Sequence, residues 1–241
     1  MAKQDYKFID KCVWIEKEKI LVIADLHIGY EQGLQEKGAF IPRQQYKITV
    51  DELRKVVEKT GRISKIIILG DLKHDFSRNS NQEWGEISSF LYFLYKNCEK
   101  IILIKGNHDN FIENITSKKG VDVKDYLIIG ENAFIHGDKQ YLDILDKKIK
   151  RIFIGHLHPA VSIRENAKVE RYKCFLVGKW KGKEIVILPS FFPLIEGVDI
   201  SREDMGEGNL VYSFDLNDFK VFIGDGENVL DFGKLKEIEK D

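Results

Sequence analysis

The chain has 241 residues, 43% hydrophobic and 32% charged, which is the composition of a globular protein and excludes a disordered one. Its 38 basic and 39 acidic side chains leave a formal charge of −1, so no overall charge favours non-specific binding to nucleic acid. The first residues lack the apolar core of a signal peptide, no apolar run is long enough to span a bilayer, and three distant cysteines fit a reducing compartment, so we expect a cytoplasmic protein without membrane contact.

Short apolar runs rich in Ile, Val and Leu predict strands at 19–25, 65–71, 100–107, 132–137 and 151–156. They lack strict alternation, which indicates strands that are buried on both faces. Two helices are predicted between the first three runs. The segment 42–61 has Pro42 near its start and Gly61 just past its end, and 81–97 carries apolar residues at helical spacing.

The pattern changes after residue 160. Segments 161–165, 169–189 and 210–224 predict strands joined by turns, and therefore a second, more antiparallel sheet packed on the first half. The segment SREDMGEGN (201–209) predicts a surface loop. No repeat or linker divides the chain, so we expect one domain of the α/β layered class over residues 1–241.

The chain contains six histidines, and each lies at or just beyond the end of an apolar run, in the motifs ADLH (24–27), GDLKHD (70–75), GNHD (106–109), IHG (135–137) and GHLH (155–158). In an extended segment residues i and i+2 point to the same side, so His156 and His158 could face one point in space. Ligands bind beyond the carboxyl ends of strands in open α/β sheets. Five such ends meeting at one edge would bring together Asp25, His27, Asp71, Asn107, His136, His156 and His158.

This mixed oxygen and nitrogen set suits a pair of borderline divalent ions such as Mn, Fe, Zn, Co or Ni. The glycines at 70, 106, 137 and 155 permit sharp turns and close backbone approach at the same places.

The motifs resemble those of the calcineurin-like metallophosphoesterases, which run D-x-H, G-D, G-N-H-[DE], H and G-H-x-H in this order. The resemblance implies a four-layered α/β/β/α sandwich with two metal ions, Mn favoured, at one edge of the sheets. It implies that His108 is catalytic and that Asp109 orients its neighbours. It also implies the metal ligands: one ion is held by Asp25, His27 and His158, the other by Asn107, His136 and His156, and Asp71 bridges them.

The activity implied by the resemblance is hydrolysis of phosphodiester bonds in small or cyclic nucleotides or at nucleic-acid ends. A hydroxide bridging the two ions would attack phosphorus in line, and His108 would stabilise charge or protonate the departing oxygen. A phosphomonoesterase acting on a small metabolite is the alternative that the same site allows. A non-catalytic interaction scaffold is a further alternative, although relatives of that kind lose the histidine that corresponds to His108.

One position departs from the common family pattern. Many members have an acid at the fifth position of the second motif, where this chain has His74. A histidine there resembles the SbcD-type nucleases, and His74 would contact substrate phosphate, assist protonation of the leaving group or serve the fold alone. The segments 25–46 and, less distinctively, 187–200 are similar to small archaeal phosphoesterases related to those nucleases and to phosphoesterases encoded beside DNA ligases.

Weaker candidates surround these motifs. Tyr30 is a candidate substrate contact, and Arg43, Lys73 and Arg78 are candidate phosphate contacts, although surface charges of this kind are common. Trp14, Trp84 and Trp180 are expected to be packing residues. The sequence leaves the oligomeric state open, a homodimer included.

Overall fold

The computed structural model describes residues 5–76, 81–165, 168–200, 213–224, 226 and 228–238. The first sheet has the strand order β1-β2-β3-β4-β5-β6. Strands β3 to β6 are parallel, and β1 and β2 extend the sheet in antiparallel fashion. The bounds are β1 Lys7–Ile9, β2 Cys12–Ile15, β3 Ile20–Ile23, β4 Ile63–Ile68, β5 Cys98–Ile104 and β6 Asp122–Lys124.

The second sheet has the order β13-β10-β11-β12-β9-β8-β7, with β14 paired to both β11 and β15. We expected the second sheet to begin after residue 160, but its first strand, β7, begins at Tyr126. Strands β8 and β9 are as apolar as those of the first sheet, so composition does not separate them. The bounds are β7 Tyr126–Ile129, β8 Asn132–Ile135, β9 Arg151–Ile154, β10 Pro159–Glu165, β11 Lys168–Trp180, β12 Lys183–Ile187, β13 Val198–Asp199, β14 Lys220–Gly224 and β15 Val229–Lys234.

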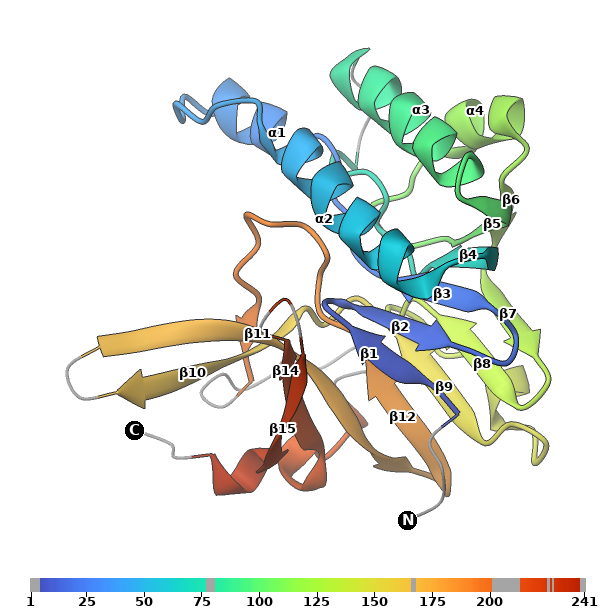
Figure 1. Ribbon diagram of the computed structural model, residues 1–241, viewed down its shortest axis with the longest axis vertical. Helices are drawn as coiled ribbons and strands as arrows, with labels where there is room; N and C mark the ends of the chain where they lie inside the picture. Colours follow the sequence, from blue (N-terminus) through green and yellow to red (C-terminus); the bar gives the residue numbers. More distant parts are fainter. Residues whose placement is uncertain are drawn as a thin grey trace.

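Helices cover the outer face of the first sheet (Figure 1). They are α1 Tyr30–Glu36, α2 Gln45–Thr60, α3 Asn81–Tyr95 and α4 Glu113–Thr116, with the 3-10 turn η1 Ser117–Lys119. The two predicted helices are present as α2 and α3. Helix α2 ends where expected, because the Gly61 N–H donates to the Val57 carbonyl and Gly61 has φ 70°. Helix α1 was not predicted, since its seven residues are too few to show a periodicity.

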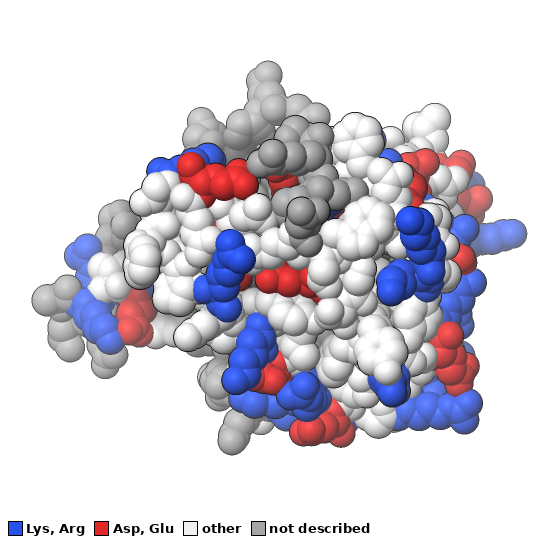
Figure 2. All heavy atoms as spheres, turned by 90° about the horizontal axis from the view of Figure 1, so that it is seen from above, with Lys and Arg blue, Asp and Glu red and all other residues white. Residues whose placement is uncertain are grey.

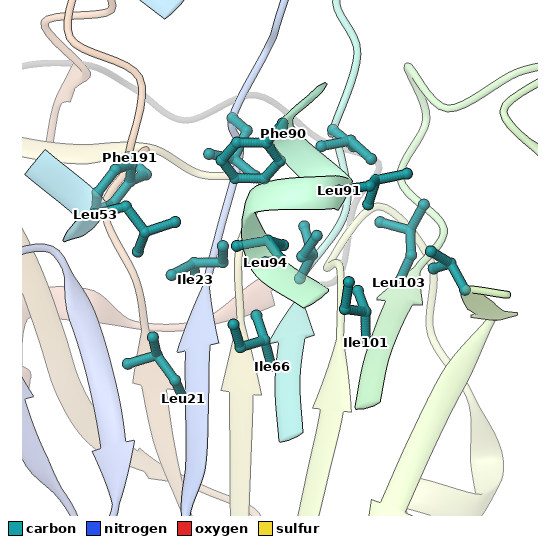
Figure 3. Packing of buried hydrophobic residues seen from close by; sticks show 14 of the residues in the cluster. Leu21, Ile23, Leu53, Ile66, Phe90, Leu91, Leu94, Ile101, Leu103 and Phe191 are labelled. Carbon is teal, nitrogen blue, oxygen red and sulfur yellow. The ribbon is translucent and has the colours of Figure 1, made fainter. Parts of the chain in front are cut away.

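Alternation along each strand assigns neighbouring residues to different layers of the core. In β3, Leu21 and Ile23 face the helices, where they meet Leu53 and residues of α3 (Figure 3). The intervening Val22 faces the second sheet and belongs to the same cluster as Phe153 of β9. The strands are thus buried on both faces, as predicted.

The predicted α/β sandwich class is confirmed. Within the described residues, the outer face of the second sheet is covered by short 3-10 helices whose Ile144, Leu216 and Leu235 pack on its strands. These helices are η2 Leu142–Leu145, η4 Leu216–Asp218 and η5 Leu235–Glu237. The expected loop at 201–209 lies outside the described residues, and the single domain stays a prediction.

The surface carries both signs of charge. Seen from above, Lys and Arg side chains are interspersed with Asp and Glu and form no continuous basic field on this face of the described residues (Figure 2). Trp14 is buried and Trp180 packs against the core, whereas Trp84 is 36% exposed on α3 and is not a core residue. No helix within the described ranges is long and apolar enough to cross a membrane.

Candidate metal centre

The motif side chains follow the carboxyl ends of strands in both sheets. The loops after β3, β4 and β5 carry the residues of the first three motifs, and the loops after β8 and β9 carry the last two. The expected meeting of strand ends is therefore found, but it joins two sheets that face each other. The seven predicted ligands all lie in these loops: Asp25, His27, Asp71, Asn107, His136, His156 and His158.

One group of side chains contains Asp25, His27, Asp71 and His158, with ligand atoms that all lie within 4.8 Å of one another. Nε2 of His158 is 3.4 Å from Oδ1 of Asp25 and 3.3 Å from Nε2 of His27. Nε2 of His27 is 3.8 Å from Oδ2 of Asp71. These four side chains can hold one cation.

A second group contains Asp71, His136 and His156, again within 4.8 Å. Nε2 of His136 is 3.1 Å from Nδ1 of His156, 3.5 Å from Oδ2 of Asp71 and 3.0 Å from Oδ1 of Asn107. Asp71 belongs to both groups. The arrangement can therefore hold two neighbouring cations that share one carboxylate.

From strand geometry we expected the two histidines of the last motif to face one point. The structure shows that they do not. His156 belongs to the second group and His158 to the first. Neither is in extended backbone, since their φ angles are 67° and 50°. Asp25, His27 and Asp71 also have positive φ. Non-glycine residues rarely adopt this conformation, and such strain is concentrated at functional sites.

Hydrogen bonds between the loops fix these conformations. Nδ1 of His136 donates to the Leu69 carbonyl at 2.8 Å, so its proton lies there and the Nε2 lone pair faces the second group. The His156 N–H donates to both carboxylate oxygens of Asp25, at 3.1 and 3.0 Å, and this contact joins the two sheets. Partners of this kind orient metal ligands in proteins.

Asp109 ties the second motif to the third. Its Oδ1 accepts from the Leu72 and Lys73 N–H groups, and its Oδ2 accepts from Gly106 N–H at 2.9 Å. The side chain is fully buried, and burial raises its pKa to about 6. These contacts all go to backbone, so the carboxylate positions the two loops.

The electrostatics of the site fit a metal pair. Burial, the charge of Asp25 and that of Asp109 raise the pKa of Asp71 to about 9. Burial, followed by His158, holds the pKa of His27 well below its usual range, and burial together with His136 lowers that of His156 to about 4. Buried carboxylates beside neutral imidazoles are the donor set that divalent cations bind. In addition, Nδ1 of His27 is buried and has no hydrogen-bond partner in the described residues.

His108 points into the same centre. Its Nδ1 donates to the His74 carbonyl at 2.6 Å, and its Nε2 lies 3.9 Å from Oδ2 of Asp71. The His74 carbonyl therefore holds the His108 ring, and the missing family acid is not needed for that purpose. Burial lowers the pKa of His108, whereas the hydrogen bond to the carbonyl raises it.

The His74 side chain also lies at the site. Its ring stacks on that of His108 with centroids 5.3 Å apart and meets the Tyr30 ring edge-on at 4.5 Å. Burial, followed by the charge of His108, lowers the pKa of His74 to about 4. A neutral imidazole at this place can donate or accept a hydrogen bond.

The remaining candidates differ in their positions. Lys73 is fully buried and its Nζ donates to the Asp75 carbonyl, so it is not a cation at the rim of the site. Arg43 donates to Oε1 of Gln35 at 3.2 Å. Arg78 lies outside the described residues. Sequence reasoning missed Phe76, an exposed ring whose centroid is 3.7 Å from that of His108, because no motif includes it.

The family model of the calcineurin-like phosphoesterases matches residues 18–224. The chain belongs to this family. Membership supports a phosphoester hydrolase and a metal site built from the His and Asp cluster.

Three solved structures are among those similar to the chain, and the first of them shares its fold. The nuclease MPE of Pseudomonas putida is 18% identical, covers 93% of this chain and 100% of its own, and has a TM-score of 0.66. The YfcE phosphoesterase of E. coli is 14% identical over 88% of this chain and 96% of its own, with a TM-score of 0.43. Vps29 of Entamoeba histolytica complexed with zinc is 16% identical over 89% and 99%, with a TM-score of 0.38. No curated protein sequence matches the chain.

Proposed function

We propose that this protein is a phosphodiesterase that uses two divalent ions to cleave small or cyclic nucleotides or nucleic-acid ends. The observation that carries the proposal is the convergence of two metal-ligand groups on Asp71 with Nε2 of His108 beside the same carboxylate. The shared fold of the Pseudomonas putida nuclease agrees with a diester substrate.

In this proposal the two ligand groups keep the roles expected from the family. Asp25, His27 and His158 would hold one ion, Asn107, His136 and His156 would hold the other, and Asp71 would serve both. Two such ions, when bound, supply an activated water and neutralise charge on the phosphoryl oxygens. Manganese suits the mixed oxygen and nitrogen ligands, as do other borderline ions.

His108 would act on the leaving group. Because its Nδ1 proton is held by the His74 carbonyl, Nε2 is the nitrogen that can carry a proton toward the substrate. The Nε2 proton of the imidazolium can pass to the departing oxygen. The His74 imidazole, stacked beside it, would contact the phosphate or the same leaving oxygen. Asp109 would act only by holding the two loops in register.

A cytoplasmic location belongs to the same proposal. All three cysteines lie in the described residues and are free thiols, and two of them are buried. Free thiols of this kind are typical of reducing compartments.

The test is hydrolysis of bis(p-nitrophenyl) phosphate beside p-nitrophenyl phosphate, with metal-free protein to which Mn²⁺ is returned. We expect metal-dependent diester cleavage that falls by about 10²–10⁴-fold in His108→Asn, the range for loss of a general acid. The variant should still bind two Mn²⁺ per chain, and the exposed-lysine control Lys100→Gln should match the wild type. Cleavage of the monoester alone would identify a phosphatase, and two bound ions without turnover of either ester would favour a scaffold.

A further inference from the structure

A cavity of about 480 Å³ opens beside His74. It lies between α1 and the loop after β4, and Glu83 of α3 also reaches it. Pockets of roughly 300–1,000 Å³ hold small organic ligands. The metal ligands do not line the cavity. His74 lies between the cavity and the metal centre, because the centroid of its ring is 5.5 Å from that of the His27 ring. The cavity is lined by Gly29, Gln32, Gly33, Glu36, Lys37, His74, Asp75, Phe76 and Glu83.

Phe76 gives this cavity an aromatic wall. The ring is 48% exposed although large apolar side chains are usually buried, and it tilts by 35° against the His108 ring. A planar group in the cavity could therefore stack on Phe76. The part of the ligand that carries this group would then lie near His108. Nucleobases stack on exposed aromatic side chains in this way, with little dependence on sequence.

The charges of the lining residues that the structure describes disfavour an anion. Among the described lining residues, Glu36, Asp75 and Glu83 contribute three carboxylates, whereas Lys37 contributes one ammonium group. Oε1 of Glu83 accepts from the backbone N–H groups of His74 and Asp75, so this carboxylate is fixed at the cavity wall. A phosphate in the cavity would meet like charge. An uncharged group would not.

We infer that this cavity receives the leaving nucleoside of a phosphodiester, with its base against Phe76, and that it excludes a leaving nucleoside that carries a further phosphate. The inference rests on the proposed function. Water adds to phosphorus, the bond from phosphorus to the nucleoside oxygen breaks, and His108 gives that oxygen a proton, which leaves a phosphomonoester and a free nucleoside. The substrates are then dinucleotides or chain ends, and not internal bonds of a long strand.

Gly33 lines the cavity beside His74. It lies within α1, and a Cβ at this position would stand 3.6 Å from Cδ2 of His74, which is an ordinary contact. An alanine therefore fits without a backbone shift, and a leucine would extend into the cavity.

The experiment compares kcat/KM with Mn²⁺ for dithymidine monophosphate, its 3′- and 5′-phosphorylated forms, and the thymidine methyl phosphates. We expect a higher kcat/KM when the leaving group is the nucleoside than when it is methanol. The form with an extra phosphate on the leaving nucleoside should be cleaved about tenfold more slowly than dithymidine monophosphate. Phe76→Ala should lower the nucleoside-to-methyl ratio by about 5- to 150-fold, the range of base stacking. Gly33→Leu should lower this ratio more than Gly33→Ala does. Phe232 is an exposed aromatic residue of β15, and Phe232→Ala should leave the ratio unchanged.

The outcomes separate the two proposals. Equal rates for nucleoside and methyl leaving groups, or faster cleavage of the phosphorylated form, would overturn the cavity assignment and leave the phosphodiesterase intact. If Phe76→Ala slows both substrates alike, the ring serves only to seat His108, and the assignment is wrong. If no diester is cleaved by the wild type, the proposed function fails and the inference fails with it.

Discussion

At the residue scale, the site contains buried carboxyl groups, which the folding free energy alone would disfavour. Asp25, Asp71 and Asp109 are all buried within the same edge of the sandwich. Burial of carboxylates costs free energy unless cations or hydrogen bonds compensate. In Asp71 the compensation by protein groups is incomplete, and its pKa rises to about 9. Such sites exchange stability for function.

Asp71→Asn should therefore raise the free energy of unfolding of the metal-free protein, by about 0.5–2 kcal/mol. The amide keeps an oxygen for the His108 N–H, which donates to Oδ1 of Asp71 at 2.9 Å. It also removes the cost of protonating the carboxyl on folding, which a pKa of about 9 imposes at neutral pH. Urea unfolding in the presence of a chelator measures the change. Asp125→Asn, at an exposed position, is the control.

Adding Mn²⁺ should reverse the order of the two proteins. A ligand at 100 times its Kd stabilises the state that binds it by about 2.7 kcal/mol, so the wild type gains stability and the variant, which lacks the shared carboxylate, gains less. A variant that is less stable than the wild type without metal would mean that Asp71 serves the fold and not the ions.

At the element scale, the sequence predicts the strands and their ends well, because buried parallel strands are continuous apolar runs. The motif glycines are predicted for the correct reason. A Cβ on Gly106 would stand 2.2 Å from Oδ1 of Asp71, which shows that only glycine lets these two loops touch. The left-handed φ angles of the ligands and the assignment of β8 and β9 to a second sheet could not be predicted, since both arise from contacts between loops far apart in the chain.

Gly155→Ala tests the closeness of the two sheets. A Cβ at this position would lie 2.8 Å from the Leu69 carbonyl oxygen and 2.9 Å from Oδ2 of Asp25, atoms that belong to the loops of the first sheet. We expect a loss of about 1–3 kcal/mol of unfolding free energy, the usual cost of overpacking, together with weaker Mn²⁺ binding by calorimetry.

Gly85→Ala is the matched control. Gly85 lies in α3 with no atom within 4 Å of its would-be Cβ, so alanine should stabilise the protein by about 0.5–1 kcal/mol through helix propensity. Equal stability of Gly155→Ala and wild type would show that the sheets can separate at this edge without cost.

At the scale of the whole molecule, the segment after β12 joins both sheets to the helices. The Leu188 N–H donates to the Ile154 carbonyl of the second sheet, and the Phe191 N–H donates to the Ala24 carbonyl beyond the end of β3. The Phe191 side chain packs among the helices (Figure 3). Ser190 Oγ donates to the Asp25 carbonyl at 2.8 Å. This segment thus supports the first metal-ligand loop from the opposite sheet.

Lys173 of β11 binds the backbone of this segment. Its Nζ donates to the carbonyls of Ser190 and Phe192, the first at 3.0 Å. Burial and then the charge of Lys11 lower its pKa to about 7, while Glu52, Asp10 and Asp25 act in the opposite direction. The amine is therefore charged in the fold only below about pH 7, whereas in the unfolded chain it stays charged to about pH 10.5.

Between these two pH values the unfolded state binds more protons than the folded state, so stability should rise with pH. For one proton the slope is at most about 1.4 kcal/mol per pH unit. We expect the unfolding free energy of the wild type to rise from pH 7 to pH 9 more steeply than that of Lys173→Met, by about 1 kcal/mol per pH unit, in urea titrations at constant salt.

The methionine variant should be the less stable of the two proteins at pH 9, because it leaves two carbonyls without a donor. This difference in stability should shrink toward pH 6. Lys179→Met, at an exposed position of the same strand, should follow the wild-type slope. Parallel slopes for wild type and Lys173→Met would show that Lys173 keeps its charge in the folded protein, held by the two carbonyl oxygens.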